Sequence, residues 1–377
     1  MTTADFIVIG AGMAGAAAAY FLADHGRGVV LERESAPGYH STGRSAALYT
    51  ETYGNAAIRA LTVASGRFFR APPAGFADVP LLHPRGLMVI AQASDATRVE
   101  HEIAAGKRFA PNLRMLSAGE ATALCPVLRD DWTGHAFLEP DAMDIDVHAI
   151  HQGFLRGFKA KGGRIVTDAA AQAIAASDRG WEVETRAGRF IAPVLVNAGG
   201  AWADEVARLA GLPPVALSAK RRTALIVDAD PVPNAAWPMV VDIGESFYFK
   251  PESGRLLVSP ADETAMPATD AQPDEIDIAE AVARLEAATR FKVRRVLRKW
   301  AGLRTFASDK TLVIGPDPLA RGFIWMAGQG GYGIQTAAAA GRAAVALAHG
   351  AALPGDLAEL GLVAADLLPN RLRPTSL

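Results

Sequence analysis

The sequence contains a single cysteine, Cys125, among its 377 residues. One cysteine excludes both an intramolecular disulfide and a cysteine-rich zinc site, and it fits a reducing compartment. Neither sign of charge is in excess, since 38 Lys and Arg face 40 Asp and Glu for a net charge of −2. Because nucleic-acid-binding proteins normally carry a basic surplus, we expect no nucleic-acid partner.

Long apolar runs are also missing. The mostly apolar segment Phe6–Leu22 is interrupted by glycines and is preceded by no Lys or Arg, so it lacks the positive region of a signal peptide. The alanine-rich segment Thr336–His349 is cut by Gly341 and Arg342. We therefore expect no integral membrane segment and a cytoplasmic location. With 50% hydrophobic and 21% charged residues the chain is not disordered, and its length exceeds what one compact core usually holds.

The N-terminal residues predict a dinucleotide site. A strand, a glycine turn, a helix and a second strand ending in an acid follow one another as Asp5–Ile9, Gly10–Gly15, Ala16–His25 and Gly28–Glu32. Gly10 permits the tight turn, Gly12 lets the backbone approach a pyrophosphate, and Gly15 allows the helix to pack closely on the strand. The pyrophosphate would lie at the helix N-terminus, and Glu32 would accept hydrogen bonds from the ribose, which disfavours NADP. The motif does not separate FAD from NAD, and a structural turn without ligand is the alternative.

Further glycine-punctuated segments occur far along the chain. They are Pro37–Ala47, Ala192–Ala203, Trp300–Gly315 and Gly328–Thr336. Glycine-rich turns that enter helices thus lie near both ends of the sequence. One extended dinucleotide held by both ends explains this arrangement.

These segments resemble the FAD-dependent D-amino-acid dehydrogenases and oxidases of the glycine oxidase and sarcosine oxidase type, most closely the bacterial D-arginine dehydrogenases. The most specific ones are Pro37–Ala47, Lys220–Arg222, Glu245–Tyr248 and Gln329–Thr336, and the resemblance covers nearly the whole chain. It implies an α/β protein of the D-amino-acid oxidase type, with a Rossmann-type FAD-binding domain and a mixed-sheet α+β substrate domain. The FAD-binding domain is expected to be discontinuous (1–85, 144–216 and 300–377), and the substrate-binding domain to comprise 86–143 and 217–299.

The resemblance implies FAD bound without a covalent bond, and Cys125 lies in no segment that resembles a flavin attachment site. The glycine motif and the resemblance together assign to FAD the residues Gly10, Gly12, Ala14, Gly15, Glu32, Arg33, Ser41, Thr42, Gly43, Arg44, Ser45, Ala46, Ala47, Leu48, Ala171, Gly331, Tyr332, Gly333, Ile334 and Gln335. Ala171 rests on the resemblance alone, whereas Glu32 and the glycine turn have support from the residue pattern itself.

For the reaction, the resemblance implies oxidative deamination of a D-amino acid, with a hydride passing from Cα to flavin N5 and the imino acid hydrolysing to a keto acid and ammonia. It places Arg222 and Arg304 as the clamp for the substrate carboxylate, a role that suits the planar guanidinium. Tyr53, Tyr248 and Gly331 complete the implied site. Without the resemblance, Arg222 fits a solvated basic cluster, Arg304 a structural salt bridge, and the tyrosines core aromatics. No histidine base is required if the amine binds neutral.

Two leucines distinguish this chain from its arginine-preferring relatives. Leu48 and Leu87 occupy side-chain-pocket positions where those relatives carry polar or acidic groups. Burying a guanidinium against leucines costs several kcal/mol, so we expect neutral or apolar D-amino acids as substrates and an unidentified electron acceptor. An oxidase that reduces O₂ to peroxide, an N-methyl amino-acid or amine oxidase, and a non-catalytic flavin- or nucleotide-binding module remain alternatives.

Two other patterns have simpler interpretations. His148 and His151 would share a helix face, but Asp146 reads as the N-cap of that helix, and we expect no metal site. The basic segment Arg290–Lys299 is interpreted as a solvated helix face.

Overall fold

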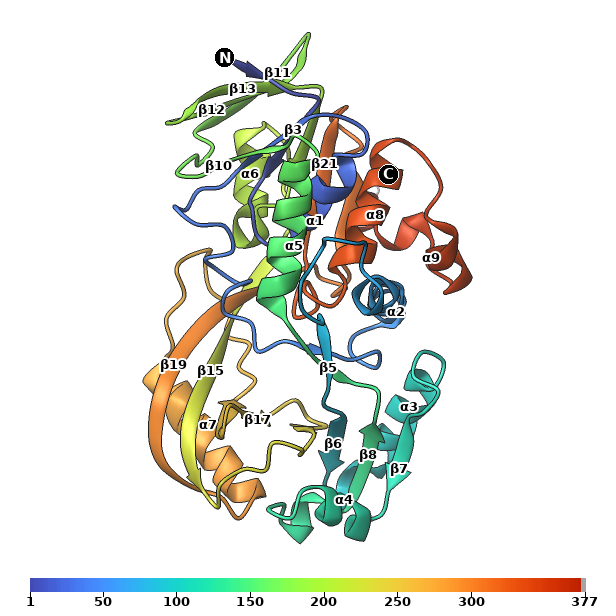
Figure 1. Cartoon of the computed structure of the whole chain (residues 1–377), viewed down its shortest axis with the longest axis vertical. Coiled ribbons are helices and arrows are strands. Elements are labelled where there is room, and N and C mark those ends of the chain that lie inside the picture. The colour runs from blue at the N-terminus through green and yellow to red at the C-terminus, as the bar shows by residue number, and fades with distance from the viewer. Residues whose placement is uncertain (374–377) are drawn as a thin grey trace.

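The computed structural model describes residues 1–373. Its long axis separates two regions: a six-stranded sheet with its helices lies at one end, and an eight-stranded sheet lies at the other (Figure 1). Both termini lie in the first region (Figure 1). These two sheets are the expected pair of a Rossmann-type and a mixed-sheet unit, so the predicted fold class is confirmed. The domain boundaries themselves stay a prediction.

The six-stranded sheet is parallel except for β20, which pairs antiparallel with β21. Its strands in spatial order are β10 (Arg164–Val166), β3 (Gly28–Leu31), β2 (Phe6–Ile9), β14 (Val194–Asn197), β21 (Phe323–Ala327) and β20 (Val313–Pro316). Alternate side chains of β2 enter different cores, since Phe6 and Val8 pack toward helices while Ile7 and Ile9 pack toward a smaller sheet. Burial on both faces explains why these strands lack polar alternation. The smaller sheet consists of β1 (Thr2–Thr3), β13 (Gly188–Ala192), β12 (Gly180–Thr185) and β11 (Ala173–Ser177).

Helix α1 (Met13–Leu22) packs between α5 (Val147–Ala160) and α8 (Ala337–Ala348). Its four consecutive alanines, 16–19, are fully buried, which allows the close helix contacts. The helix begins earlier and ends earlier than the predicted range because the extended Gly12 is its N-cap and the chain turns after Leu22. The remaining helices are α2 (Ala56–Arg70), α3 (Ala96–Gly106), α4 (Ala118–Leu124), α6 (Ala203–Leu209), α7 (Glu275–Ala288) and α9 (Gly355–Glu359).

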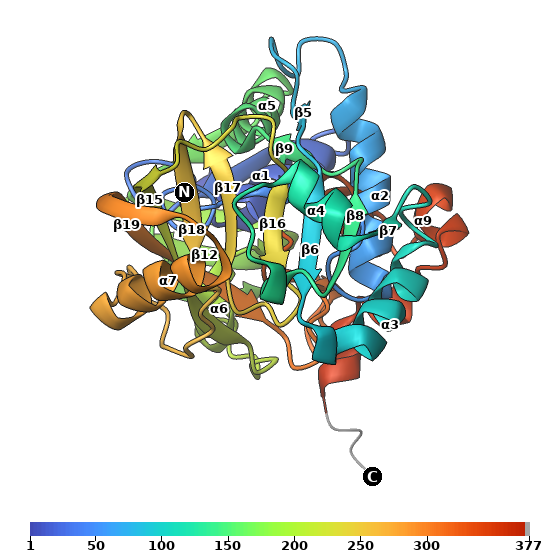
Figure 2. The same cartoon turned by 90° about the horizontal axis from the view of Figure 1, so that it is seen from below.

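The eight-stranded sheet is mixed, because β16 and β6 pair in parallel while the other neighbours are antiparallel. Its strands in spatial order are β19 (Lys292–Phe306), β15 (Ser218–Asp230), β18 (Arg255–Ser259), β17 (Tyr248–Glu252), β16 (Met239–Asp242), β6 (Leu87–Ala91), β8 (His135–Glu139) and β7 (Arg114–Leu116). Helices α4 and α7 cover the outer face (Figure 2). Met88 and Ile90 point to that side, whereas Leu87 and Val89 point to the inner face.

The prediction of a helix face over Arg290–Lys299 is wrong, since most of this segment belongs to the edge strand β19. β19 pairs with β15 along its whole length, and this distant pairing overrides the local pattern. Its cations meet acids on neighbouring elements: Arg294 pairs with Asp230, and Lys299 pairs with Glu275.

A three-stranded sheet of β4 (Leu48–Tyr49), β9 (Met143–Ile145) and β5 (Leu82–Pro84) leads into α5. Asp146 caps α5 by accepting a hydrogen bond from the Ala149 backbone, as predicted. His151 is buried, and its Nε2 lies 2.8 Å from the carbonyl oxygen of Ala11. Burial lowers the pKa of His151, so the neutral ring donates to that carbonyl and ties α5 to the glycine turn.

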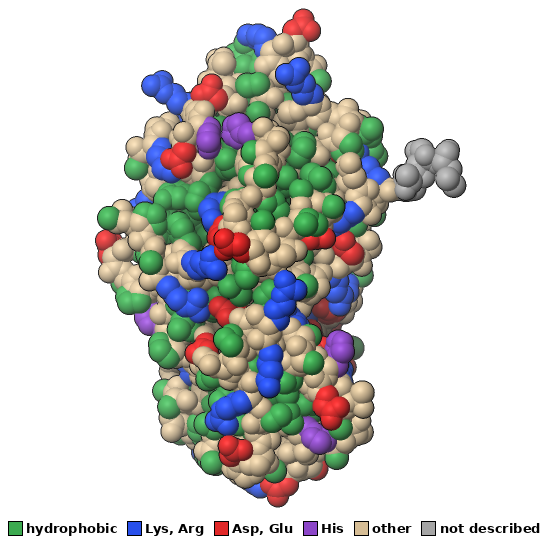
Figure 3. Space-filling model, turned by 90° about the vertical axis from the view of Figure 1, so that its right-hand side faces the viewer, with side chains coloured by type: hydrophobic (Ala, Val, Ile, Leu, Met, Phe, Trp, Pro, Cys, Tyr) green, Lys and Arg blue, Asp and Glu red, His purple; other side chains and the backbone are tan. Residues whose placement is uncertain are grey.

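Residues 1–373 contain no helix that is both long and apolar enough to span a membrane. Within the same range, no group of three or more His, Cys, Asp or Glu side chains could hold a metal ion. The face shown in Figure 3 carries basic and acidic side chains interspersed with hydrophobic ones, so neither sign of charge dominates it.

Candidate functional site

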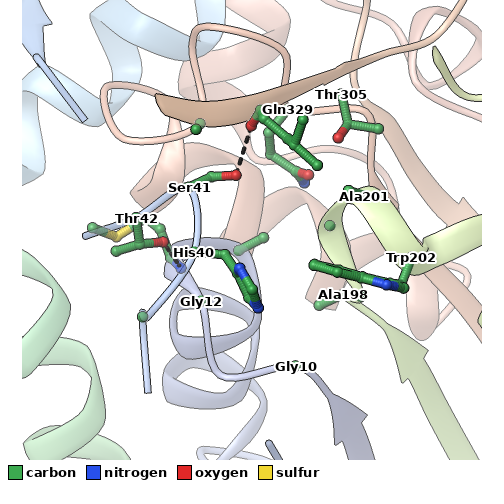
Figure 4. Close-up of a pocket in the computed structure, with 18 of the residues that line it drawn as sticks. Gly10, Gly12, His40, Ser41, Thr42, Ala198, Ala201, Trp202, Thr305 and Gln329 are labelled. Carbon is green, nitrogen blue, oxygen red and sulfur yellow. Dashed lines mark hydrogen bonds between the residues drawn. The ribbon is translucent and has the colours of Figure 1, made fainter. Parts of the chain in front are cut away.

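An elongated cavity lies beside the glycine turn that follows β2 (Figure 4). Residues at the carboxyl ends of β2 and β3 and directly after β14 line one part of it, and residues of β15 and β19 line another part. The residues assigned to FAD from the sequence that line it are Gly10, Gly12, Ala14, Glu32, Arg33, Ser41, Thr42, Arg44, Ser45, Ala46, Ala171, Gly331, Gly333 and Ile334. The structure thus brings together segments that are more than 300 positions apart in the sequence.

The three glycines of the turn have different surroundings. Gly10 has a φ of +98°, and a Cβ there would lie 2.5 Å from the oxygen of Ala198. A Cβ at Gly15 would lie 1.9 Å from the oxygen of Gly10. At Gly12, by contrast, the nearest heavy atom is Thr42 Oγ1 at 3.4 Å. Gly10 and Gly15 therefore serve the close packing, whereas Gly12 leaves the helix N-terminus open to the cavity, as a bound diphosphate requires.

Glu32 directly follows β3 and is buried. Its Oε2 accepts a hydrogen bond of 2.8 Å from the Ala11 backbone, and its Oε1 accepts one of 3.0 Å from the Glu34 backbone. Each carboxylate oxygen can accept more than one hydrogen bond, so Glu32 can hold the glycine turn and still receive ribose hydroxyls.

Trp202 and His40 lie next to each other in the lining of this cavity (Figure 4). Their ring centroids are 4.7 Å apart, and the guanidinium of Arg33 lies 4.4 Å from the Trp202 ring. His40 Nε2 is 2.9 Å from Glu34 Oε1. Sequence reasoning assigned neither aromatic residue to the site, although both lie in segments that the glycine pattern singled out. The two rings, tilted by 50° to each other, form an aromatic wall against which the nucleoside part of a dinucleotide would pack.

A second cavity adjoins the first. Residues that line both are Ser45, Ala46, Arg222, Tyr248, Arg304, Gly331 and Ile334. In the β15–β19 pair, Arg222 lies opposite Gly302 and Arg304 lies opposite Lys220, so the two arginines are diagonal neighbours on one face of the sheet. The predicted carboxylate clamp therefore lies where the two cavities meet.

The two guanidiniums differ in their partners. Arg222 donates from Nε to the Asp262 carbonyl at 2.9 Å, and its Nη2 is 3.3 Å from Glu263 Oε1. Arg304 donates from Nη1 to the Tyr53 hydroxyl at 3.3 Å, and among residues 1–373 no carboxylate lies within 4.0 Å of it. Arg222 is only 8% exposed, and its burial, with the nearby charge of Arg304, lowers its pKa.

These contacts exclude the alternative interpretations of both arginines. Arg222 is not part of a solvated cluster, because it is buried, and Arg304 forms no structural salt bridge within the described residues. The buried Arg222 and the half-buried Arg304 are neighbouring cations, and because Arg304 has no carboxylate partner within the described residues, the site favours an anion. A carboxylate matches the guanidinium geometry.

Tyr53 and Gly331 complete this corner. A Cβ at Gly331 would lie 3.0 Å from Arg304 Nη1 and 3.1 Å from the Tyr53 hydroxyl, so a side chain there would displace the pair. The Tyr53 ring packs against Tyr332 with the centroids 5.0 Å apart and the ring planes tilted by 59°. Burial raises the pKa of Tyr53, and its hydroxyl is therefore protonated at neutral pH and can donate to an anion.

The second cavity has an apolar part beside the eight-stranded sheet, although the acids Asp242, Glu245 and Glu263 also line the cavity. Leu48 and Leu87, which come from β4 and β6, line it together with Met239, Val241 and Tyr248. The structure thus brings the two predicted specificity residues into one wall. No histidine lines this cavity within residues 1–373. Met239 and Val241 were not assigned to the site, because they belong to no recognisable motif.

Several residues assigned to FAD lie away from the elongated cavity. Ala47, Leu48, Tyr332 and Gln335 line the second cavity, while Gly15 and Gly43 line neither. The side-chain amide of Gln335 donates to the Thr50 carbonyl at 3.2 Å and to Thr62 Oγ1 at 2.9 Å.

Residues 5–347 match the family described as FAD dependent oxidoreductase (DAO). The chain belongs to this family. Its cofactor is FAD, and the open Gly12 backbone, the buried Glu32 and the aromatic wall described above fit that cofactor.

Three relatives illustrate the range of the family. The mitochondrial dimethylglycine dehydrogenase of Rattus norvegicus is 24% identical over 362 residues, which cover 90% of this chain but 42% of that protein. A D-amino-acid oxidase of Streptomyces coelicolor is 32% identical over 148 residues, or 39% of this chain and 44% of that protein. The structure of L-proline dehydrogenase from P. horikoshii superposes with a TM-score of 0.83 at 20% identity, covering 94% of this chain and 96% of that one. The chain thus spans less than half the length of the dimethylglycine dehydrogenase, and the particular likeness to D-arginine dehydrogenases stays a prediction.

Proposed function

We propose that this oxidoreductase is a dehydrogenase that oxidises D-amino acids with neutral or apolar side chains. The observation that carries the proposal is the half-buried Arg304, which lies beside Arg222 at the junction of the two cavities and has no carboxylate partner among residues 1–373. The stereochemistry rests on the resemblance of the sequence. The location is proposed to be cytoplasmic.

The substrate carboxylate would bind between Arg304 and Arg222, with the Tyr53 hydroxyl as a further donor. Arg304 supplies a planar fork whose remaining N–H groups have no protein partner within residues 1–373, so binding there removes no ion pair of the described residues. Arg222 keeps its orientation through the Asp262 carbonyl and Glu263 while it contributes charge.

The side chain of the substrate would lie against Leu48, Leu87 and Met239. None of these three side chains can pair with a guanidinium or an ammonium group, so a cationic side chain placed against them would lose its hydration without compensation. The acids Asp242 and Glu245 also line this cavity, and the proposal requires that the substrate side chain contact the leucines and not these acids. Neutral and apolar side chains would bind there with a gain from apolar burial.

Bound FAD supplies the hydride acceptor for oxidation of the substrate at Cα. The protein contributes binding and orientation, since a fixed carboxylate and a fixed side chain leave one face of Cα directed to the shared part of the cavities. The amine is proposed to bind in its neutral form, consistent with the lining of the second cavity, which contains no histidine within the described residues. An external electron acceptor then completes the cycle.

A comparison of substrates tests the proposal. The flavin of the holoprotein is mixed anaerobically with D-leucine, D-methionine and D-arginine and with the corresponding L-amino acids, and its absorbance is followed. We expect reduction by the apolar D-amino acids at rates above those for D-arginine. Reduction by dimethylglycine or another N-methyl amine alone would overturn the substrate class, and fast reoxidation by O₂ would make the protein an oxidase.

A further inference from the structure

A buried carboxylate outside the described site, Glu139, accepts three hydrogen bonds from Thr50, Glu51 and Thr52, the residues that directly precede Tyr53. Glu139 ends β8 and is 1% exposed. Its Oε2 accepts from Thr50 Oγ1 at 2.6 Å and from Thr52 Oγ1 at 2.5 Å, and its Oε1 accepts from the Glu51 backbone at 2.6 Å. Three consecutive residues are thus bound to one side chain.

The segment from Thr50 to Thr52 directly precedes Tyr53. Its other side is held by the Gln335 amide, which donates to the Thr50 carbonyl at 3.2 Å. Gln335 follows the glycine turn that lines both cavities, whereas Glu139 belongs to the eight-stranded sheet. The segment is therefore fixed between the two large units of the fold, and Tyr53 is the first residue beyond this attachment.

A carboxylate at this place needs an explanation. No Lys or Arg nitrogen lies within 4.0 Å of Glu139 among residues 1–373, and a buried acid without a cation is costly. The three donors compensate for that cost, and burial raises the pKa of Glu139. A hydrophobic side chain would pack as well but would leave the Glu51 N–H without an acceptor.

We propose that Glu139 is a positioning residue for substrate binding: it holds Thr50–Thr52 so that the Tyr53 hydroxyl stays beside Arg304 and facing the substrate carboxylate. This rests on the proposed function, because it takes Tyr53 as a ligand of that carboxylate. A displacement of the hydroxyl by about 1 Å is enough to weaken a positioned interaction severely.

The test is a double-mutant cycle on the holoprotein. The apparent dissociation constant of D-leucine and the limiting rate of flavin reduction are measured anaerobically for Glu139→Ala and for the nearly isosteric pair Thr50→Val/Thr52→Val, each with Tyr53 and with Tyr53→Phe. With Tyr53 present, we expect the dissociation constant to rise about tenfold in both variants. In the Tyr53→Phe background, we expect a further rise of less than about twofold.

Two further variants separate positioning from stability. Glu139→Gln should stay near wild type, because its amide oxygen can accept from the Glu51 N–H while its NH₂ donates to the two hydroxyls. Asp317→Asn removes another buried carboxylate, which accepts from Trp325 Nε1 and lies outside both cavities. It should lower the melting temperature without changing the dissociation constant.

The outcomes are distinguishable. If the wild-type flavin is reduced by no D-amino acid, the proposed function fails and takes this inference with it. If wild type is active but both disrupting variants bind D-leucine normally, or lose the same factor with and without the Tyr53 hydroxyl, the positioning role is refuted. If Glu139→Ala does not fold or contains no flavin, the paired valine variant gives the decision.

Discussion

Replacing Arg304 by methionine should separate function from stability. Arg304 is half-buried beside Arg222, and within residues 1–373 its hydrogen-bond partner is the Tyr53 hydroxyl. Methionine has a similar length and no charge, so Arg304→Met removes the unpaired cation while it fills most of the space. We expect a folded flavoprotein that no longer binds the substrate carboxylate.

The magnitude follows from the contacts. Two charge-assisted hydrogen bonds to the carboxylate, each about 1.5–3 kcal/mol, correspond to a loss of about 10²- to 10⁴-fold in kcat/KM. The lost bond to Tyr53 costs about 1 kcal/mol of stability, and this is offset by relief from burying a guanidinium without an anion. For a chain of this length, 1 kcal/mol moves the Tm by about 1 °C. The Tm should therefore stay unchanged or rise by about 1–3 °C.

The assay combines thermal unfolding of the holoprotein with anaerobic flavin reduction by D-leucine. Arg222→Met is the matched control, because it takes a donor from Glu263 and from the Asp262 carbonyl and should lower both kcat/KM and the Tm. The reasoning is refuted if Arg304→Met unfolds more than about 3 °C below wild type, a change of several kcal/mol, and keeps kcat/KM within about threefold.

Three further predictions concern the cofactor, the pocket and the cysteine. Gly15→Ala should give protein with less than about a tenth of the wild-type flavin content, because its Cβ would lie 1.9 Å from the oxygen of Gly10. Gly119→Ala, where a Cβ meets nothing within 4 Å, is the control and should load FAD normally. The flavin-to-protein absorbance ratio measures the flavin content of both variants. Leu87→Glu should raise the ratio of kcat/KM for D-arginine to that for D-leucine by about 100-fold, because it places an anion in the apolar wall. The control Leu87→Met should leave this ratio unchanged. Equal ratios in both variants would refute the role of this wall. Burial raises the pKa of Cys125 to about 12. At pH 8 the thiol of the folded protein should therefore not react with a thiol reagent, and it should react only after unfolding. Rapid labelling of the native protein would contradict this prediction.

The sequence was most informative where function depends on a local pattern. The glycine turn, the following acid and the helix after Asp146 lie where the pattern predicted them, because tight turns and caps are determined by residues close in the chain. Leu48 and Leu87 line one cavity, and their role in substrate specificity stays a prediction.

Features created by distant pairing could not be derived in this way. The basic segment Arg290–Lys299 became part of an edge strand because β15 supplies its hydrogen-bond partner. The same pairing places Arg222 diagonally from Arg304, which no local spacing indicates. Glu139 likewise has no motif around it, and only its contacts with Thr50–Thr52 give it a role.

The central claim is that the two-arginine site oxidises apolar D-amino acids. The most direct measurement is an anaerobic absorbance titration of the purified yellow protein with matched D- and L-enantiomers of leucine, methionine and phenylalanine. We predict that the D-enantiomers bleach the flavin and the L-enantiomers do not. A flavin that none of them reduces, or that the L-enantiomers reduce faster, would contradict the claim.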